Sequence, residues 1–222
     1  DIRGALHAMD KKNSHAIEID VRNPAEIREI FDTTTYSGGG SVNLMNEQYL
    51  TEIGFQKGLR RYLRKYAYGN ATTQNLWEML EKATGKPVRS VMGTYTRQAG
   101  YPLVIVKEGP LTSPGIRNLE LEQRRFLFDG SRDTKNTLWT IPIGIKTSSG
   151  EKPDYRYMKS KKMPLPVSTS GNWIKLNPDT SSLYRVLYPE SMRHNLSQAV
   201  KNGDDKITPQ DRIGLLDDAF AL

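Results

Sequence analysis

Cysteine is absent from this 222-residue chain, and long hydrophobic runs are absent as well. Without cysteine the chain can form neither a disulfide framework nor a thiolate metal site, which fits a reducing, intracellular compartment. No apolar run approaches the ~20 residues that span a bilayer, and no signal peptide opens the sequence. These absences predict a cytoplasmic protein that does not contact membranes.

Common catalytic motifs are missing too. The sequence has no P-loop, no G-x-G-x-x-G after a strand and no serine nucleophile elbow. Its three histidines, His7, His15 and His194, form no H-E-x-x-H or other paired metal spacing. His7 and His15 flank Asp10, so a metal site there stays open, but a buried or capping histidine is favoured. We therefore predict no catalytic metal ligands in this chain.

The composition is that of a folded protein, with 36% hydrophobic and 26% charged residues. The length allows one large or two modest domains, each with its own core. The first residue is Asp1 rather than methionine, and the last residues stop within a helical pattern. We therefore expect the chain to be a piece of a longer protein.

Helical periodicity dominates residues 1–99. Asn23-Pro24 is a typical helix start, with a capping residue followed by proline at the first helical position. Later helices are expected from about 41 to 52, from 55 to 66, from a cap at Thr73 to a stop at Gly85, and from Pro87 onward. Residues 1–99 are therefore predicted to form a helical part.

From Tyr101 the pattern changes to the alternation of half-buried strands. Strands are expected over 103–106, 119–128, 138–145, 173–176 and 183–188. Pro142 inside the third of them indicates an edge strand or a bulge. Short strands between Gly, Ser and Pro turns predict a small antiparallel β-sandwich over residues 100–188.

After Pro189 the helical pattern returns, over 191–200 and again from a capped start at Thr208. Residues 189–222 are therefore predicted to begin a second helical domain. The predicted fold class is α+β multidomain: a helical part, then a β-sandwich, then the start of another helical domain.

The net charge of +7 is the main support for a nucleic-acid partner. In the densest basic patch, residues 59–66, apolar side chains recur at i, i+3, i+4 and i+7 and the basic ones lie around the other side. This is the solvated face of a buried helix. A second cluster, residues 159–162, falls in a connection between strands. We therefore predict no nucleic-acid partner.

The most informative segment runs from Phe31 to Val42, where Tyr36 precedes the glycines Gly38–Gly40 and a helix follows. Glycine is needed where the backbone takes positive φ or passes close to another group. A tyrosine before such a bend keeps its ring packed and its hydroxyl free to reach a partner. An ordinary loop between two helices is the alternative that composition favours. If the segment is instead a functional bend, Tyr36 is its candidate functional residue.

Several segments resemble, in order, motifs of the zinc aminopeptidases related to aminopeptidase N, puromycin-sensitive aminopeptidase and the archaeal tricorn-interacting factors. The segments are Ser14–Ile17, Glu26–Gly39, Phe55–Trp77, Thr94–Pro102, Trp139–Ile143 and Asp211–Leu222. Ser14–Ile17 is similar to S-H-P-I, with Ala16 in place of proline, and Thr94–Pro102 is similar to W-T-x-Q-x-G-Y-P. The resemblance covers nearly the whole chain.

The resemblance implies that the whole protein is a zinc enzyme that releases residues from peptide N-termini. The family's zinc ligands, an H-E-x-x-H and a later glutamate, and its G-A-M-E-N loop would lie upstream, outside this chain. Tyr36 matches the catalytic tyrosine, whose phenol would stabilise the oxyanion as zinc-activated water attacks the first peptide carbonyl. The chain alone is predicted to be inactive.

Phe31 resembles the family's aromatic residue that lines the pocket for the substrate's first side chain, and a purely core role is the alternative. Gly38 departs from the family, which usually has lysine there, and a looser backbone beside Tyr36 would place its hydroxyl less well. A non-catalytic scaffold that binds peptides or proteins is therefore the second hypothesis, and a basic nucleic-acid-binding module is the third. Expected partners are peptide substrates, the missing N-terminal segment or a larger protease complex.

Overall fold

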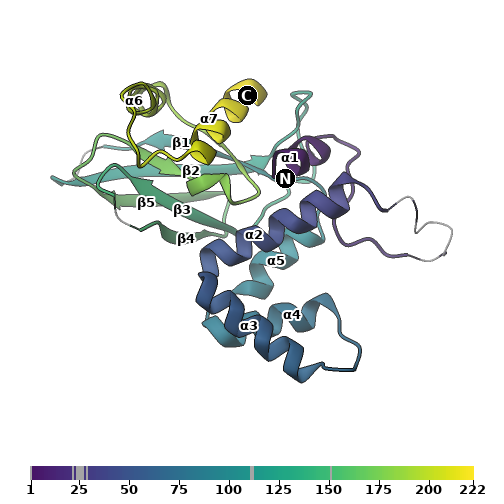
Figure 1. Cartoon of the computed structure of the whole chain (residues 1–222). Coiled ribbons are helices and arrows are strands. Elements are labelled where there is room, and N and C mark those ends of the chain that lie inside the picture. Colours follow the sequence, from purple (N-terminus) through teal and green to yellow (C-terminus); the bar gives the residue numbers. More distant parts are fainter. Residues whose placement is uncertain (1, 22, 24–27, 29, 111–112, 151) are drawn as a thin grey trace.

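The computed structural model describes residues 2–21, 23, 28, 30–110, 113–150 and 152–222. Helices come first along the chain, strands follow, and two helices end it (Figure 1). The predicted α+β class is therefore confirmed. The first helical elements are α1 (Ile2–Met9), the π-helical turn η2 (Thr34–Gly38), α2 (Gly39–Leu50), α3 (Glu52–Lys65), α4 (Thr73–Thr84) and α5 (Val88–Thr96).

The predicted starts agree with those of α2 to α5 to within three residues, and the predicted ends with those of α2 to α4 to within two. The cap of α4 is Thr72 rather than Thr73, and it forms a capping box with Asn75. Gly85 ends this helix in the left-handed conformation, with φ 67°, as glycine after a helix commonly does. The helix predicted to start at Asn23-Pro24 falls largely on residues outside the described ranges.

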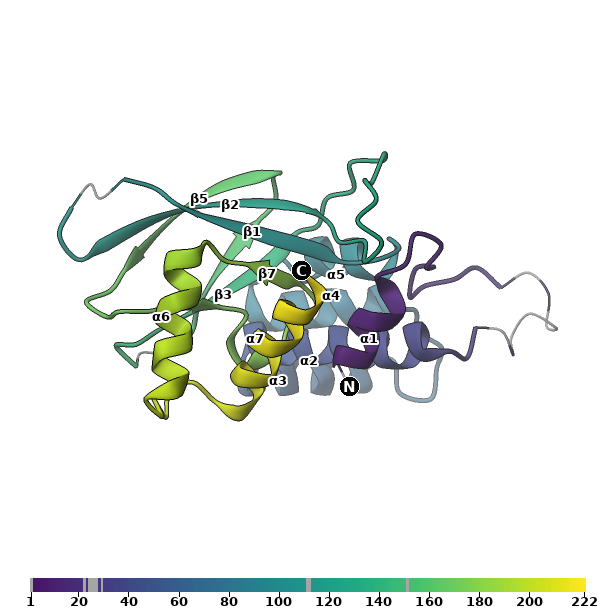
Figure 2. The same cartoon turned by 90° about the horizontal axis from the view of Figure 1, so that it is seen from above.

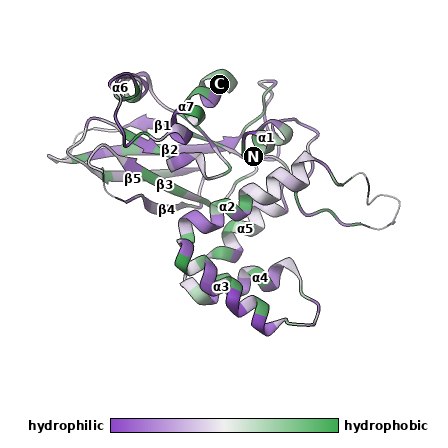
Figure 3. Ribbon diagram, viewed as in Figure 1, coloured by the Kyte–Doolittle hydropathy of each residue, from purple (hydrophilic) through white to green (hydrophobic). Residues whose placement is uncertain are grey.

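Helix α3 differs from the sequence prediction, because it is not a buried helix. The α3–α4 pair projects away from the sheets, and apolar and polar residues mix along it (Figures 1 and 3). Gly58 is its one buried residue, and Leu63, which the apolar periodicity placed inside, is 65% exposed. Its main packing partner is α4, with smaller contacts to α2, so much of α3 stays exposed.

The strands form two sheets that face one another (Figures 1 and 2). They are β1 (Pro102–Glu108), β2 (Ile116–Arg125), β3 (Ile141–Thr147), β4 (Asp154–Met158), β5 (Lys162–Ser168), β6 (Ile174–Leu176) and β7 (Arg185–Leu187). One sheet has the order β5-β2-β1-β7 and the other β4-β3-β6. All pairings are antiparallel except that of β1 with β7, a parallel pairing that the alternation did not indicate.

Strands β4 and β5 were not predicted. Pro164 and Pro166 weaken the strand pattern of β5, because proline cannot donate to a sheet ladder. In the structure β5 is an edge strand, and both prolines are on its exposed face while Leu165 and Val167 are buried. Proline is tolerated at such an edge. The sheet therefore accepts a strand that the sequence pattern did not predict.

The edge position predicted from Pro142 is wrong for β3 as a whole, since β3 is the middle strand of its sheet. Its partner β6, however, pairs only with Ile145–Thr147. At Pro142 the strand pairs with β4 alone, through Tyr157. At Pro142, which lacks an N–H, β3 therefore has a partner strand on one side only.

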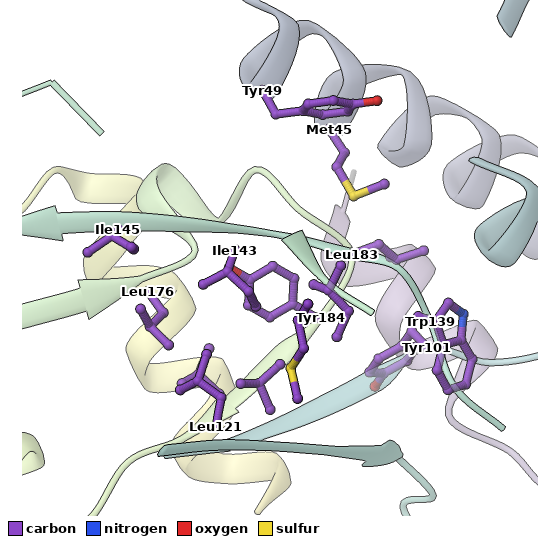
Figure 4. Packing of buried hydrophobic residues seen from close by; sticks show 14 of the residues in the cluster. Met45, Tyr49, Tyr101, Leu121, Trp139, Ile143, Ile145, Leu176, Leu183 and Tyr184 are labelled. Atoms are coloured by element: carbon purple, nitrogen blue, oxygen red, sulfur yellow. The ribbon is translucent and has the colours of Figure 1, made fainter. Parts of the chain in front are cut away.

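A single hydrophobic core joins the helical and β parts. Leu121 and Leu176, from opposite sheets, point into the space between them, where Tyr184 also lies (Figure 4). Met45 and Tyr49 of α2 approach the same core from the helical side (Figure 4) and are fully buried. Burial of these side chains fixes α2, and with it the turn η2 that precedes it, against the sandwich.

The last helices, α6 (Glu190–Lys201) and α7 (Pro209–Ala221), lie near β1 and β7. A capping box of Thr208 and Asp211 starts α7, as the sequence predicted. Helices α1 and α7 lie side by side (Figure 2), and His7 Nε2 is 3.3 Å from the Asp217 carboxylate. None of the helices described has both the length and the apolar character to cross a bilayer.

Candidate functional site

Tyr36 lies in η2, which continues without a break into α2. Asp32 starts this helix in two ways, because its carboxylate accepts from the Thr35 N–H at 2.8 Å and its carbonyl accepts from the Tyr36 N–H at 3.0 Å. Such use of a carboxylate satisfies backbone donors that a helix start leaves unpaired. π-Helical turns are rare and are found often at functional sites. Tyr36 is thus held by a defined helix start rather than by a loop.

The expected bend at Gly38–Gly40 is wrong. Gly38 and Gly39 have φ of −64° and −60°, both helical. Gly38 is buried, and a Cβ built there would lie 3.2 Å from Ile17 Cδ1 and 3.3 Å from Met9 Sδ. Close approach, not positive φ, therefore accounts for glycine at this position, and the backbone beside Tyr36 is packed rather than loose.

Tyr36 and Phe31 lie together at the surface. Their ring centroids are 5.8 Å apart, and their side chains are 65% and 60% exposed. In the described part of the chain no group bonds to the Tyr36 hydroxyl. The exposure of Phe31 does not fit the alternative of a core residue. The two predicted site residues therefore form one aromatic surface patch with a free phenol.

A histidine–carboxylate pair, which the sequence did not indicate as a site, lies directly behind this helix start. His15 Nε2 is 2.7 Å from Asp32 Oδ2, and His15 Nδ1 is 2.8 Å from the Ala16 carbonyl oxygen. Both residues fall inside segments that resembled family motifs, Ser14–Ile17 and Glu26–Gly39. Their place in two motif-like segments was the sequence signal that could have identified them, and only the structure brings the two segments together.

The electrostatics of the pair favour two charges. Partial burial alone would lower the pKa of His15, but its hydrogen bonds to the Ala16 carbonyl and the Asp32 carboxylate raise it above its usual value. Partial burial would likewise raise the pKa of Asp32, but the Thr35 N–H and the His15 imidazole hold it below its usual value. Each residue therefore stabilises the charged form of the other.

The described residues contain no group of three or more His, Asp or Glu side chains that could hold a metal ion. His7 contacts Asp217 at 3.3 Å, and Asp10 is 3.9 Å from its other ring nitrogen. His15 uses both nitrogens on Asp32 and Ala16. The histidines that left a metal site open in the sequence are thus engaged in hydrogen bonds, and the residues that the structure describes do not fit a zinc site.

Matched substitutions test the packing of the glycines. We expect Gly40→Leu to stabilise the chain by up to about 1 kcal/mol, because Gly40 is exposed with open space around its Cβ and leucine is the better helix former. Gly38→Leu brings the same propensity gain but must displace Ile17 and Met9, so we expect a loss of about 1–3 kcal/mol. Urea unfolding of both variants gives the free energies. Equal effects at the two positions would mean that Gly38 is not closely packed.

Comparison with known proteins matches two stretches of this chain, one in its helical part and one at its C-terminal end. Residues 3–95 match the family model described as Peptidase family M1 domain, and residues 173–222 match the ERAP1-like C-terminal domain. The first match contains Phe31, Tyr36 and the His15–Asp32 pair.

Relatives come from animals, plants and archaea. The chain is 38% identical to puromycin-sensitive aminopeptidase of Caenorhabditis elegans, over 95% of this chain and 22% of the relative. It is 37% identical to aminopeptidase M1 of Arabidopsis thaliana, over 95% and 25%. It is 36% identical to tricorn protease-interacting factor F2 of Thermoplasma volcanium, over 99% and 25%. The chain spans about a quarter of the length of these relatives. The motifs, the two family matches and these relatives together match the chain to peptidase family M1.

Proposed function

We propose that this chain is a fragment of an aminopeptidase and that it supplies the donor which stabilises the oxyanion of the reaction. The observation that carries the proposal is the Tyr36 phenol, which is exposed and unbonded within the described chain although its backbone is fixed by Asp32. A free donor on a rigid helix start is what electrostatic stabilisation of a developing charge requires.

Tyr36 acts on the first peptide bond of a substrate. As water attacks the carbonyl carbon, its oxygen becomes an oxyanion, and the phenol O–H donates a hydrogen bond to it. Phe31, whose ring lies 5.8 Å from that of Tyr36, contacts the side chain of the first substrate residue. The exposure of both aromatic rings supports this division of roles, because exposed apolar patches are typical of binding sites.

We propose that the zinc of the family is held outside this chain, which is supported by the lack of a three-ligand group among the described residues. We propose that the substrate's free amino group is likewise recognised by residues outside this chain. We therefore expect the chain by itself to be inactive. For the whole protein we propose peptides as substrates and a cytoplasmic location. We also propose a division into residues 1–99, 100–188 and 189–222, which is supported by the order of helices, strands and helices.

The alternative is a scaffold that binds peptides without turnover. Its sequence argument was a loose backbone at Gly38, and the contacts of Gly38 with Ile17 and Met9 weaken that argument. A nucleic-acid-binding role has only charge in its favour: the net charge of +7 and the exposed basic residues of α3, Lys57, Arg60, Arg61, Arg64 and Lys65. Binding through phosphate contacts alone is lost as salt rises.

The function is tested with the complete protein and a chromogenic aminoacyl substrate. We expect release of chromophore from the substrate with a free α-amino group and none from the same substrate after N-acetylation. This chain alone, at equal concentration, should release none from either. Binding of the free substrate without release by a zinc-loaded complete protein would select the scaffold instead.

A further inference from the structure

We propose that His15 and Asp32 are positioning residues that hold Tyr36 in place through a charged hydrogen bond. The inference rests on the function proposed for Tyr36. The pair joins two separate segments, since His15 lies in the loop after α1 and Asp32 precedes η2. Neither residue needs to touch the substrate for this role.

The geometry requires a doubly protonated His15. Its two ring nitrogens lie 2.8 and 2.7 Å from the Ala16 carbonyl oxygen and the Asp32 carboxylate, which are both acceptors. A neutral imidazole carries one N–H and can donate to only one of them. The imidazolium donates to both, and hydrogen bonds between charged groups are about twice as strong as neutral ones.

Asp32 transmits this restraint to Tyr36. One carboxylate oxygen accepts from His15, the other accepts from the Thr35 N–H, and the Asp32 carbonyl accepts from the Tyr36 N–H. A displacement of Asp32 therefore displaces the backbone of Tyr36 directly. A catalytic hydrogen bond depends on placement to within roughly 0.5 Å, so a freed helix start lowers turnover.

The same chain offers a matched control. His7 also contacts a carboxylate, Asp217, at 3.3 Å, but this contact joins α1 to α7 and does not involve η2. His7→Ala and His15→Ala each remove one imidazole that contacts an aspartate, Asp217 and Asp32 respectively. Only the second should affect Tyr36.

The first experiment is amide hydrogen exchange on this chain. In His15→Ala we expect exchange at the Thr35 and Tyr36 amides to become about tenfold faster, because a charged hydrogen bond is lost. In His7→Ala the same amides should exchange as in the parent. Equal protection of both amides in the parent and in His15→Ala would overturn the proposal. If His15→Ala does not fold, Asp32→Asn replaces it, since asparagine keeps an acceptor for Thr35 and removes the charge.

The second experiment is steady-state kinetics on the complete protein. We expect His15→Ala to lower kcat about tenfold while KM stays within about twofold and zinc content is unchanged. In a Tyr36→Phe background the same substitution should cause no further loss, because the pair acts through the Tyr36 hydroxyl. His7→Ala should match the parent. Asp32→Asn is the more conservative substitution, so its kcat should fall less than that of His15→Ala.

The outcomes separate this inference from the function on which it rests. Parental turnover in Tyr36→Phe would refute the proposed function, and hydrogen exchange would still decide whether the pair holds the helix start. A slow Tyr36→Phe together with a fully active His15→Ala would refute the positioning role alone. An equal further loss from His15→Ala in the Tyr36→Phe background would mean that the pair acts elsewhere.

Discussion

Replacing Tyr36 with phenylalanine in the complete protein is expected to lower kcat by about 100-fold to 1,000-fold, the cost of losing one oxyanion donor. KM should stay nearly unchanged, because the hydrogen bond forms mainly to charge that develops in the transition state. The substitution removes an exposed hydroxyl that has no partner in the described chain, so fold and zinc content should be intact. Steady-state kinetics with zinc analysis of both forms is the measurement.

Tyr68 supplies the control, since it is an exposed tyrosine like Tyr36 and lies beyond the end of α3, away from η2. Tyr68→Phe should have the parental kcat. If the kcat of Tyr36→Phe lies within threefold of the parental kcat, Tyr36 is a structural residue of the helix start. A parent that binds zinc and is itself inactive would favour the scaffold.

Replacing Asp211 with alanine is expected to destabilise the chain by about 3–5 kcal/mol, because it leaves a buried cation without its partner. Lys175 is 3% exposed, and its ammonium lies 2.9 Å from the Asp211 carboxylate, which is itself fully buried. Lys146 approaches the same carboxylate at 3.0 Å. Burial alone would raise the pKa of Asp211, but the two lysines hold it below its usual value.

The Asp211 carboxylate also accepts hydrogen bonds from backbone N–H groups, which alanine would leave without this acceptor. It accepts from the Asp179 N–H at 2.6 Å and from the Thr208 N–H at 3.2 Å, the second being part of the cap of α7. The loss should therefore loosen the start of α7 as well as weaken the core, while Asp217 and Asp218 still bind Arg185. For a chain of this length such a loss corresponds to a fall in Tm on the order of 10 °C.

Asp154→Ala is the matched control for this measurement. Asp154 pairs with Arg156 at 2.8 Å, but both side chains are more than half exposed, and exposed pairs contribute little. Its free energy of unfolding should stay within about 0.5 kcal/mol of the parent. Similar unfolding curves for Asp211→Ala and Asp154→Ala in urea would mean that the buried pair is not a major source of stability.

The sequence by itself determined the local elements of this protein. Hydrophobic periodicity set the order of helices, strands and helices, and short-range chemistry set several ends, such as Gly85 after α4 and Thr208 before α7. It also directed attention to Tyr36 and Phe31, which the structure brings together. These features depend on residues only a few positions apart, which a local pattern records.

The tertiary structure alone decided what depends on contacts between distant segments. It placed Gly38 inside a helix against Met9 and Ile17, left Leu63 exposed on α3, and accepted β5 as an edge strand despite its prolines. It also joined His15 to Asp32 and buried Asp211 between two lysines. Periodicity identifies an apolar face but not what covers it, and a polar residue shows its partner only when the chain has folded. The restraint on Tyr36 therefore follows from packing, whereas its place at a helix start follows from the sequence around it.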